Sequence, residues 1–92
     1  MSTFQNFIAG SFRETGPRQT IEVKNPANGR VFASVTSATE ADVIEAVDAA
    51  AAAQKPWGRL PAIERGNALR RLADAIERHQ QKIGAALAQE SG

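Results

Sequence analysis

A chain of 92 residues has room for one small domain, and its 11 Lys and Arg against 10 Asp and Glu leave a net charge of only +1. This balance gives no electrostatic argument for binding nucleic acid or an anionic membrane, and no run of about 18 apolar residues predicts a membrane span. The absence of cysteine excludes disulfides, thiolate metal sites and a cysteine nucleophile within these residues, and because the start has no secretory pattern we expect a cytoplasmic protein.

Residues 1–38 are predicted to form a β-hairpin arm, and its first hairpin surrounds Ala9 and Gly10. Two short stretches with apolar residues, 6–8 and 11–13, flank this pair, which is typical of a hairpin with a glycine turn. The tightest turns need a positive φ at both central positions, which alanine does not favour. We therefore expect a turn longer than two residues.

A second hairpin is predicted from residue 19 to residue 36. Residues 19–24 alternate polar and apolar side chains, as a half-buried strand does, and residues 25–29 contain the Asn, Pro and Gly of a turn. Residues 30–36 then form the returning strand. Its Val31, Ala33 and Val35 would share one face, while Phe32 would point the other way and need separate cover.

Residues 39–92 are predicted to be helical. Thr39 is a suitable N-cap for the first helix, and Asp42, three residues on, completes a variant of the capping box. We expect Pro56 to end this helix and Pro61 to occupy the first position of the next one. The apolar stripe breaks near His79, so we predict a third helix after it, ending at residues 91–92.

These helices carry apolar stripes with few large side chains. Hydrophobic residues make up 42% of the chain, but many are alanine, which buries little area at roughly 25 cal/mol per Å². We expect the stripes to lie against polypeptide outside this chain, and Leu72 to be buried. The stripes consist of Val43, Ala46, Val47, Ala50, Leu69, Leu72, Ala73, Ile76, Ile83, Ala86 and Leu87.

The sequence contains no recognisable catalytic motif. His79 is the only histidine and has no cysteine or second histidine to complete a site, so we interpret it as a helix-end residue and not as a base or metal ligand. Trp57 is interpreted as a packing anchor and not as a ligand-stacking residue. Charged helix residues are interpreted as a solvated or subunit-contacting face, not as acid–base pairs or a phosphate site; they are Glu64, Asp74, Glu77, Glu90, Arg65, Arg70, Arg71 and Arg78.

The order of these features nevertheless resembles the start of the aldehyde dehydrogenase superfamily. Residues 7–12 are similar to its F-I-N-G-x-[WF] opening, residues 23–31 to its V-x-N-P-A-T-G-E-V segment, and residues 87–92 to its L-x-x-E-x-G-K segment. The helical residues between them have the family's spacing, so the resemblance extends over residues 7–92. Residues 60–65 look closest to lactaldehyde or glycolaldehyde dehydrogenases. Ala9 and Asn28 depart from the usual Asn and Thr, which affects turns and not chemistry.

The resemblance implies an α+β segment, with β-hairpins followed by two or three helices, that forms part of the larger α/β aldehyde dehydrogenase fold. Residues 39–92 would pack on an absent cofactor-binding domain, so the expected partner is the remainder of the chain, in a homo-oligomer. The parent would oxidise an aldehyde to a carboxylic acid with NAD or NADP. The family's catalytic and cofactor-binding residues lie beyond position 92, so none is assigned here and the 92 residues alone are expected to be inactive, without cofactor or metal. The alternative is a stand-alone helical interaction or oligomerisation module.

Overall fold

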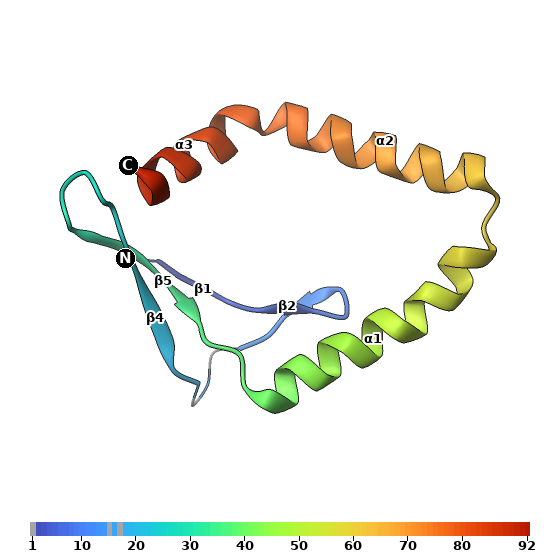
Figure 1. Ribbon diagram of the computed structural model, residues 1–92, viewed down its shortest axis with the longest axis horizontal. Helices are drawn as coiled ribbons and strands as arrows, with labels where there is room; N and C mark the ends of the chain where they lie inside the picture. The colour runs from blue at the N-terminus through green and yellow to red at the C-terminus, as the bar shows by residue number, and fades with distance from the viewer. Residues whose placement is uncertain (1, 15, 17) are drawn as a thin grey trace.

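The chain forms an open ring in which a strand arm is followed by three helices (Figure 1). The computed structural model describes residues 2–14, 16 and 18–92. The strands are β1 (Ser2–Phe4), β2 (Phe7–Ile8), β3 (Ser11–Phe12), β4 (Thr20–Lys24) and β5 (Val31–Thr36). The helices are α1 (Glu40–Arg59), α2 (Ala62–Arg78) and α3 (Gln80–Ser91). This order confirms the predicted α+β segment with hairpins first and helices after them.

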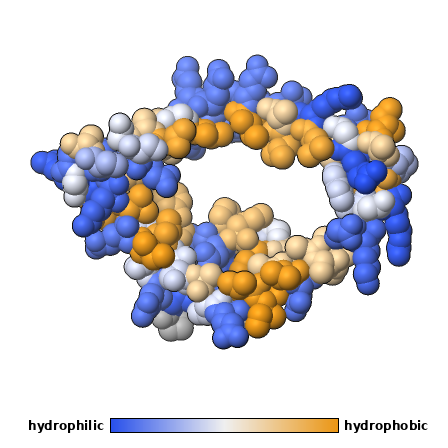
Figure 2. Space-filling view, viewed as in Figure 1, coloured by the Kyte–Doolittle hydropathy of each residue, from blue (hydrophilic) through white to orange (hydrophobic). Residues whose placement is uncertain are grey.

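The ring is much wider than a packed domain of the same length. Its extents are 48 × 33 × 16 Å and its radius of gyration is 16.8 Å, whereas a compact domain of this length would have about 12 Å. The space-filling view shows an open centre between the helices and the strand arm (Figure 2). The elements therefore follow one another around the ring without packing into a common core.

A small sheet in the order β1-β5-β4 forms one side of the ring. Strands β4 and β5 pair antiparallel, as predicted, with Val23 opposite Ala33. Ala33 is buried and Val23 half-buried, but Ile21 is 55% exposed, so the strand predicted to be half-buried is covered only in part. Strand β1 pairs parallel to β5 and was not predicted, because three residues are too few to show a period.

The first hairpin has a tighter turn than predicted. Phe7 pairs with Phe12 and Ile8 with Ser11, so only Ala9 and Gly10 form the turn. Both have positive φ, 52° and 84°, as a mirror-image turn requires. The expectation of a longer turn was wrong: Ala9 adopts the left-handed conformation, and the ring centroids of the two phenylalanines lie 4.9 Å apart across the hairpin.

The predicted capping box at the start of α1 is confirmed. The Thr39 hydroxyl accepts a hydrogen bond from the Asp42 amide at 3.1 Å, and the Asp42 carboxylate accepts one from the Thr39 amide at 2.9 Å. The predicted end at Pro56 was wrong, because α1 continues to Arg59. A proline removes one hydrogen bond from a helix but leaves the amides after it free to bond, so the last turn can form.

The break between the second and third helices lies where the sequence predicted it. Residue His79 ends α2 and precedes α3, with φ −110° and ψ 16° outside the helical range. Pro61 is the N-cap of α2 and not its first helical residue, one position from the prediction. The ring closes where α3 returns to the strand arm, and Gly92 lies beside Pro26 and Ala27 of the β4–β5 turn.

The apolar stripes of the helices are largely uncovered. Leu72 is 56% exposed, so the prediction that it is buried was wrong for this chain. Buried apolar residues in the described part of the chain are Ile8 and Ala33, both in strands. Apolar side chains line the inner edge of the α2–α3 arm and face the open centre in Figure 2. Large helical residues that are at least half exposed include Val43, Val47, Leu69, Ile76 and Leu87.

Candidate functional site

The titratable residues considered from the sequence do not come together. His79 lies at the α2–α3 junction, where its Nδ1 is 2.8 Å from the Ala75 carbonyl oxygen, so the ring contacts the helix end as a capping residue would. The four carboxylates considered on α2 and α3, Glu64, Asp74, Glu77 and Glu90, are all exposed. Among the described residues no three His, Cys, Asp or Glu side chains are grouped to hold a metal ion.

The helical arginines lie along α2 without converging on one point. Arg70 donates to the Asn67 side-chain oxygen at 3.1 Å, an exposed contact one turn away on the same helix. Arg71 lines a shallow depression with Trp57 and Glu64. A phosphate site would need several donors aimed at one position, and this arrangement does not supply them.

Trp57 occupies the junction between α1 and α2. Its side chain lines one shallow depression with Ala53 and Leu60 and another with Asn67 on α2, and it remains 40% exposed. Trp57 and α2 therefore border the same depression, and at this exposure the side chain is only partly covered.

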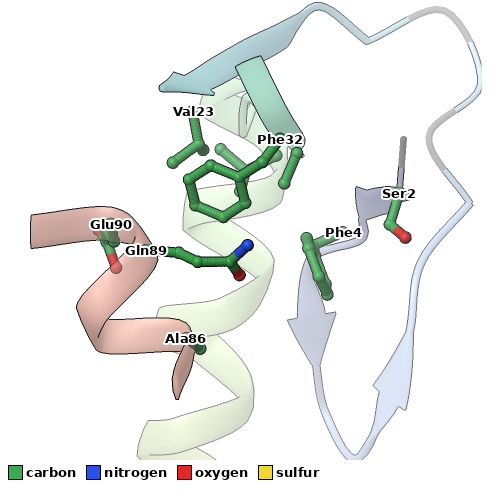
Figure 3. A pocket seen from close by; sticks show the side chains of 9 residues that line it. Ser2, Phe4, Val23, Phe32, Ala86, Gln89 and Glu90 are labelled. Carbon is green, nitrogen blue, oxygen red and sulfur yellow. The ribbon is translucent and has the colours of Figure 1, made fainter. Parts of the chain in front are cut away.

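A cavity of about 370 Å³ lies where α3 faces the sheet (Figure 3). Phe32 points into it from β5 toward Gln89, so α3 supplies part of the separate cover that this side chain was expected to need. Its walls hold neither a histidine nor a cysteine; they are formed by Ser2, Phe4, Val23, Phe32, Ala33, Val35, Ala86, Gln89 and Glu90. A nucleophile beside a base, which covalent catalysis needs, is absent from this set.

An ion pair with two hydrogen bonds joins the strand arm to α1. Arg18 donates from Nε and Nη2 to the two carboxylate oxygens of Asp42, at 2.7 and 2.6 Å. Asp42 is only 4% exposed, and its carboxylate also accepts the Thr39 amide. The bond from Arg18 is the largest cause, and the bond from Thr39 the next, that holds the pKa of Asp42 well below its usual range. The bond to Asp42 in turn raises the pKa of Arg18.

A second ion pair lies one turn further along α1. Arg13 donates from Nη2 to the Ile8 carbonyl oxygen at 3.3 Å, and the same nitrogen is 2.6 Å from Glu45 Oε1. Sequence reasoning identified Asp42 only as a capping residue and assigned nothing to Arg13 or Arg18. The available signal was local, because acidic residues in a first helical turn indicate a cap and do not identify a partner from a distant loop.

Among the described residues a strand leads into a helix between β5 and α1, and this junction does not fit a dinucleotide site. Dinucleotide pyrophosphates are commonly bound by a glycine-rich turn at a helix N-terminus. Between β5 and α1 the chain has Ser37, Ala38 and Thr39, with no glycine. The N-terminus of α1 is already capped by the negative carboxylate of Asp42, which would repel a phosphate. No step of nicotinamide chemistry is therefore assigned to these residues.

The described residues form a strand arm and three helices with largely uncovered apolar faces and dispersed titratable groups. Residues 12–92 match the profile of the aldehyde dehydrogenase family. The chain belongs to the aldehyde dehydrogenase family.

Three curated relatives illustrate the range of the similarity. The chain is 46% identical over 77 residues to 2-hydroxymuconic semialdehyde dehydrogenase of Pseudomonas sp. (strain CF600), covering 83% of this chain and 16% of the relative. It is 37% identical over 86 residues to 3,6-anhydro-alpha-L-galactose dehydrogenase of Streptomyces coelicolor (strain ATCC BAA-471 / A3(2) / M145), covering 94% and 18%. It is 38% identical over 91 residues to human mitochondrial 10-formyltetrahydrofolate dehydrogenase, covering 97% and 10%.

The chain therefore spans less than a fifth of the length of each of these relatives. No solved structure matches it significantly. Over the described residues, none of the helices is both long and apolar enough to cross a membrane.

Proposed function

We propose that these 92 residues are the amino-terminal structural segment of an NAD(P)-dependent dehydrogenase that oxidises an aldehyde to a carboxylic acid. The family match over residues 12–92 supports the reaction class, because the relatives above include an enzyme named for a semialdehyde. The residues described here supply none of the reacting groups of that reaction. Their contribution is a scaffold, and the 92 residues alone are inactive.

The uncovered helical faces carry the structural part of this proposal. Large apolar side chains on all three helices are about half exposed or more, such as Val47 at 61%, Leu72 at 56% and Leu87 at 60%. Soluble monomers seldom leave contiguous apolar surfaces of this kind open. We infer that the remainder of a longer dehydrogenase chain covers them, within a homo-oligomeric cytoplasmic enzyme. The similarity of residues 60–65 supports the narrower proposal of a lactaldehyde- or glycolaldehyde-like substrate class.

Fragment complementation tests the proposal. The Pseudomonas relative would be truncated by the stretch that this chain matches, and the 92-residue chain would be added to it in purified form. We expect no reduction of NAD or NADP by the 92-residue chain alone with any aldehyde, and partial recovery of activity when the two pieces are mixed. A matched control carries Leu72→Asp and Ile76→Asp, which place charges on the apolar face and should abolish recovery.

The alternative is a stand-alone interaction module, since the same exposed faces could also bind a second copy. Sedimentation of the purified chain separates the two. A defined oligomer with a cooperative melt, together with no complementation, would favour the module, whereas NAD(P) reduction by the 92-residue chain alone would contradict both.

A further inference from the structure

The contact between the strand arm and α1 contains little apolar burial. Ile8 is the buried apolar residue of the β2–β3 hairpin that faces α1, beside Ala46 and Val43. On the helix side, Val43 and Val47 stay 53% and 61% exposed. Apolar burial of this extent stabilises the contact only weakly, because the hydrophobic contribution follows the area removed from water.

Two arginines of the arm, in contrast, reach two carboxylates on successive turns of α1. The Arg18–Asp42 pair has two parallel hydrogen bonds of 2.7 and 2.6 Å, the geometry in which a guanidinium binds a carboxylate most strongly. The Arg13–Glu45 pair is 2.6 Å long, and Arg13 also bonds the Ile8 carbonyl. Each arginine thus connects a different part of the arm to the same helix.

Asp42 couples these contacts to the formation of α1 itself. Its carboxylate accepts Arg18 and, at the same time, the Thr39 amide that begins the capping box. A carboxylate held by the capping box is already oriented for Arg18, so binding the arm costs less side-chain entropy. A bound Arg18 likewise favours the capped helix start.

We propose that Arg13 and Arg18 form a latch with Glu45 and Asp42 that sets the position of α1 against the strand arm. The latch, and not apolar packing, orients the helix. Its two ion pairs form without the rest of the longer protein. All four residues lie within the first half of the chain, so the arm and α1 adopt their arrangement as one unit to which the remaining helices are attached through residues 60–61. This inference does not depend on the enzymatic activity proposed above.

The absence of cysteine allows the latch to be tested by spin labels at two introduced positions. Ser11→Cys on the hairpin and Lys55→Cys on α1 replace exposed residues outside the latch. Pulsed electron paramagnetic resonance on the full 92-residue chain would then measure the distribution of distances between the arm and the helix. We expect one narrow distance distribution when the four residues of the latch are unchanged. A broad distribution in that labelled chain would overturn the proposal.

Substitutions that open the latch should free the arm. Arg13→Glu and Arg18→Gln are each expected to widen the distribution by about twofold or more, because the arm then samples many positions. The matched control is Asp48→Asn, which removes a carboxylate from an exposed position of the same helix. A distribution that stays narrow in both arginine variants would overturn the latch.

Charge exchange separates loss of the latch from loss of folding. Because the pair is partly exposed, we expect it to accept reversed charges: Arg13→Glu combined with Glu45→Arg should narrow the distribution again, which an unfolded chain cannot do. Salt gives a second readout, since the screening length falls to about 3 Å at 1 M and exposed pairs weaken most. Ile8→Ala keeps both ion pairs, so its distribution should widen with salt as that of the parent chain does, whereas a chain with both arginines substituted should respond little to salt. Failure of the exchange to restore the narrow distribution, or equal salt responses in all variants, would contradict the proposal.

Discussion

Arg18 and Asp42, 24 residues apart in the chain, meet through two hydrogen bonds at the first turn of α1. The same carboxylate caps the helix through the Thr39 amide, so one side chain fixes both the helix start and the arm. Because Asp42 is almost fully buried, its charge depends on these partners and not on water. Its protonation should therefore affect helix formation as well as the arm.

Acid is expected to weaken the fold through Asp42. The pKa of Asp42 is lowered in the folded chain, mainly by Arg18, while an unfolded aspartate titrates near about 3.9. A lowered folded pKa contributes stability above the unfolded value, and this stability is lost as the pH falls below about 4. Melting followed by helical circular dichroism should show this loss in the unsubstituted chain.

Asp42→Asn should reduce stability at neutral pH and flatten its dependence on pH in that acidic range. Asp48→Asn, on an exposed position of the same helix, should leave the dependence unchanged. If the stability of Asp42→Asn falls with pH in parallel with that of the unsubstituted chain, Asp42 does not cause the acid sensitivity.

The helix cap itself is expected to contribute measurably. Thr39→Ala removes the hydroxyl that accepts the Asp42 amide at 3.1 Å, and loss of such a cap typically costs about 1 kcal/mol. Urea unfolding measures the change. Thr39→Ser keeps the hydroxyl and should lie close to the unsubstituted chain, and an equal loss in both variants would argue against the cap.

Local signals explain why Thr39 and Asp42 were predictable from sequence while Arg18 was not. A capping box is a relation between residues three apart, and the alternation of residues 19–24 is equally local. The ion pairs join residues far apart in the chain, and no periodicity of the sequence indicates such a pairing. Pro56 was misassigned because a helix can continue for one turn after a proline, and Leu72 because a stripe shows which side is apolar but not whether anything covers it.

Ala9 in the turn of the first hairpin has a left-handed backbone conformation. Its φ is 52°, which alanine adopts at a cost of roughly 1–2 kcal/mol. Asparagine tolerates this conformation and suits the first position of such turns. Ala9→Asn should therefore stabilise the hairpin by up to about 1 kcal/mol, measured by the exchange of the Arg13 amide, which bonds the Asn6 carbonyl at 2.8 Å. Ala9→Val, which resists positive φ, should have the opposite effect; no difference between the two variants would contradict the assignment of strain.

The exposure of Leu72 gives opposite expectations for the isolated chain and for the longer enzyme proposed above. At 56% exposure in the 92-residue chain, Leu72→Ala should change the free energy of unfolding by about 0.5 kcal/mol or less, as surface substitutions do. Ile8→Ala is the buried comparison at 6% exposure and should cost clearly more.

In the full-length dehydrogenase the same Leu72→Ala should cost about 2–5 kcal/mol, because loss of the covered side chain would then leave a cavity. Equally small effects in both proteins would mean that this face of α2 stays uncovered, and the scaffold proposal would lose its structural basis.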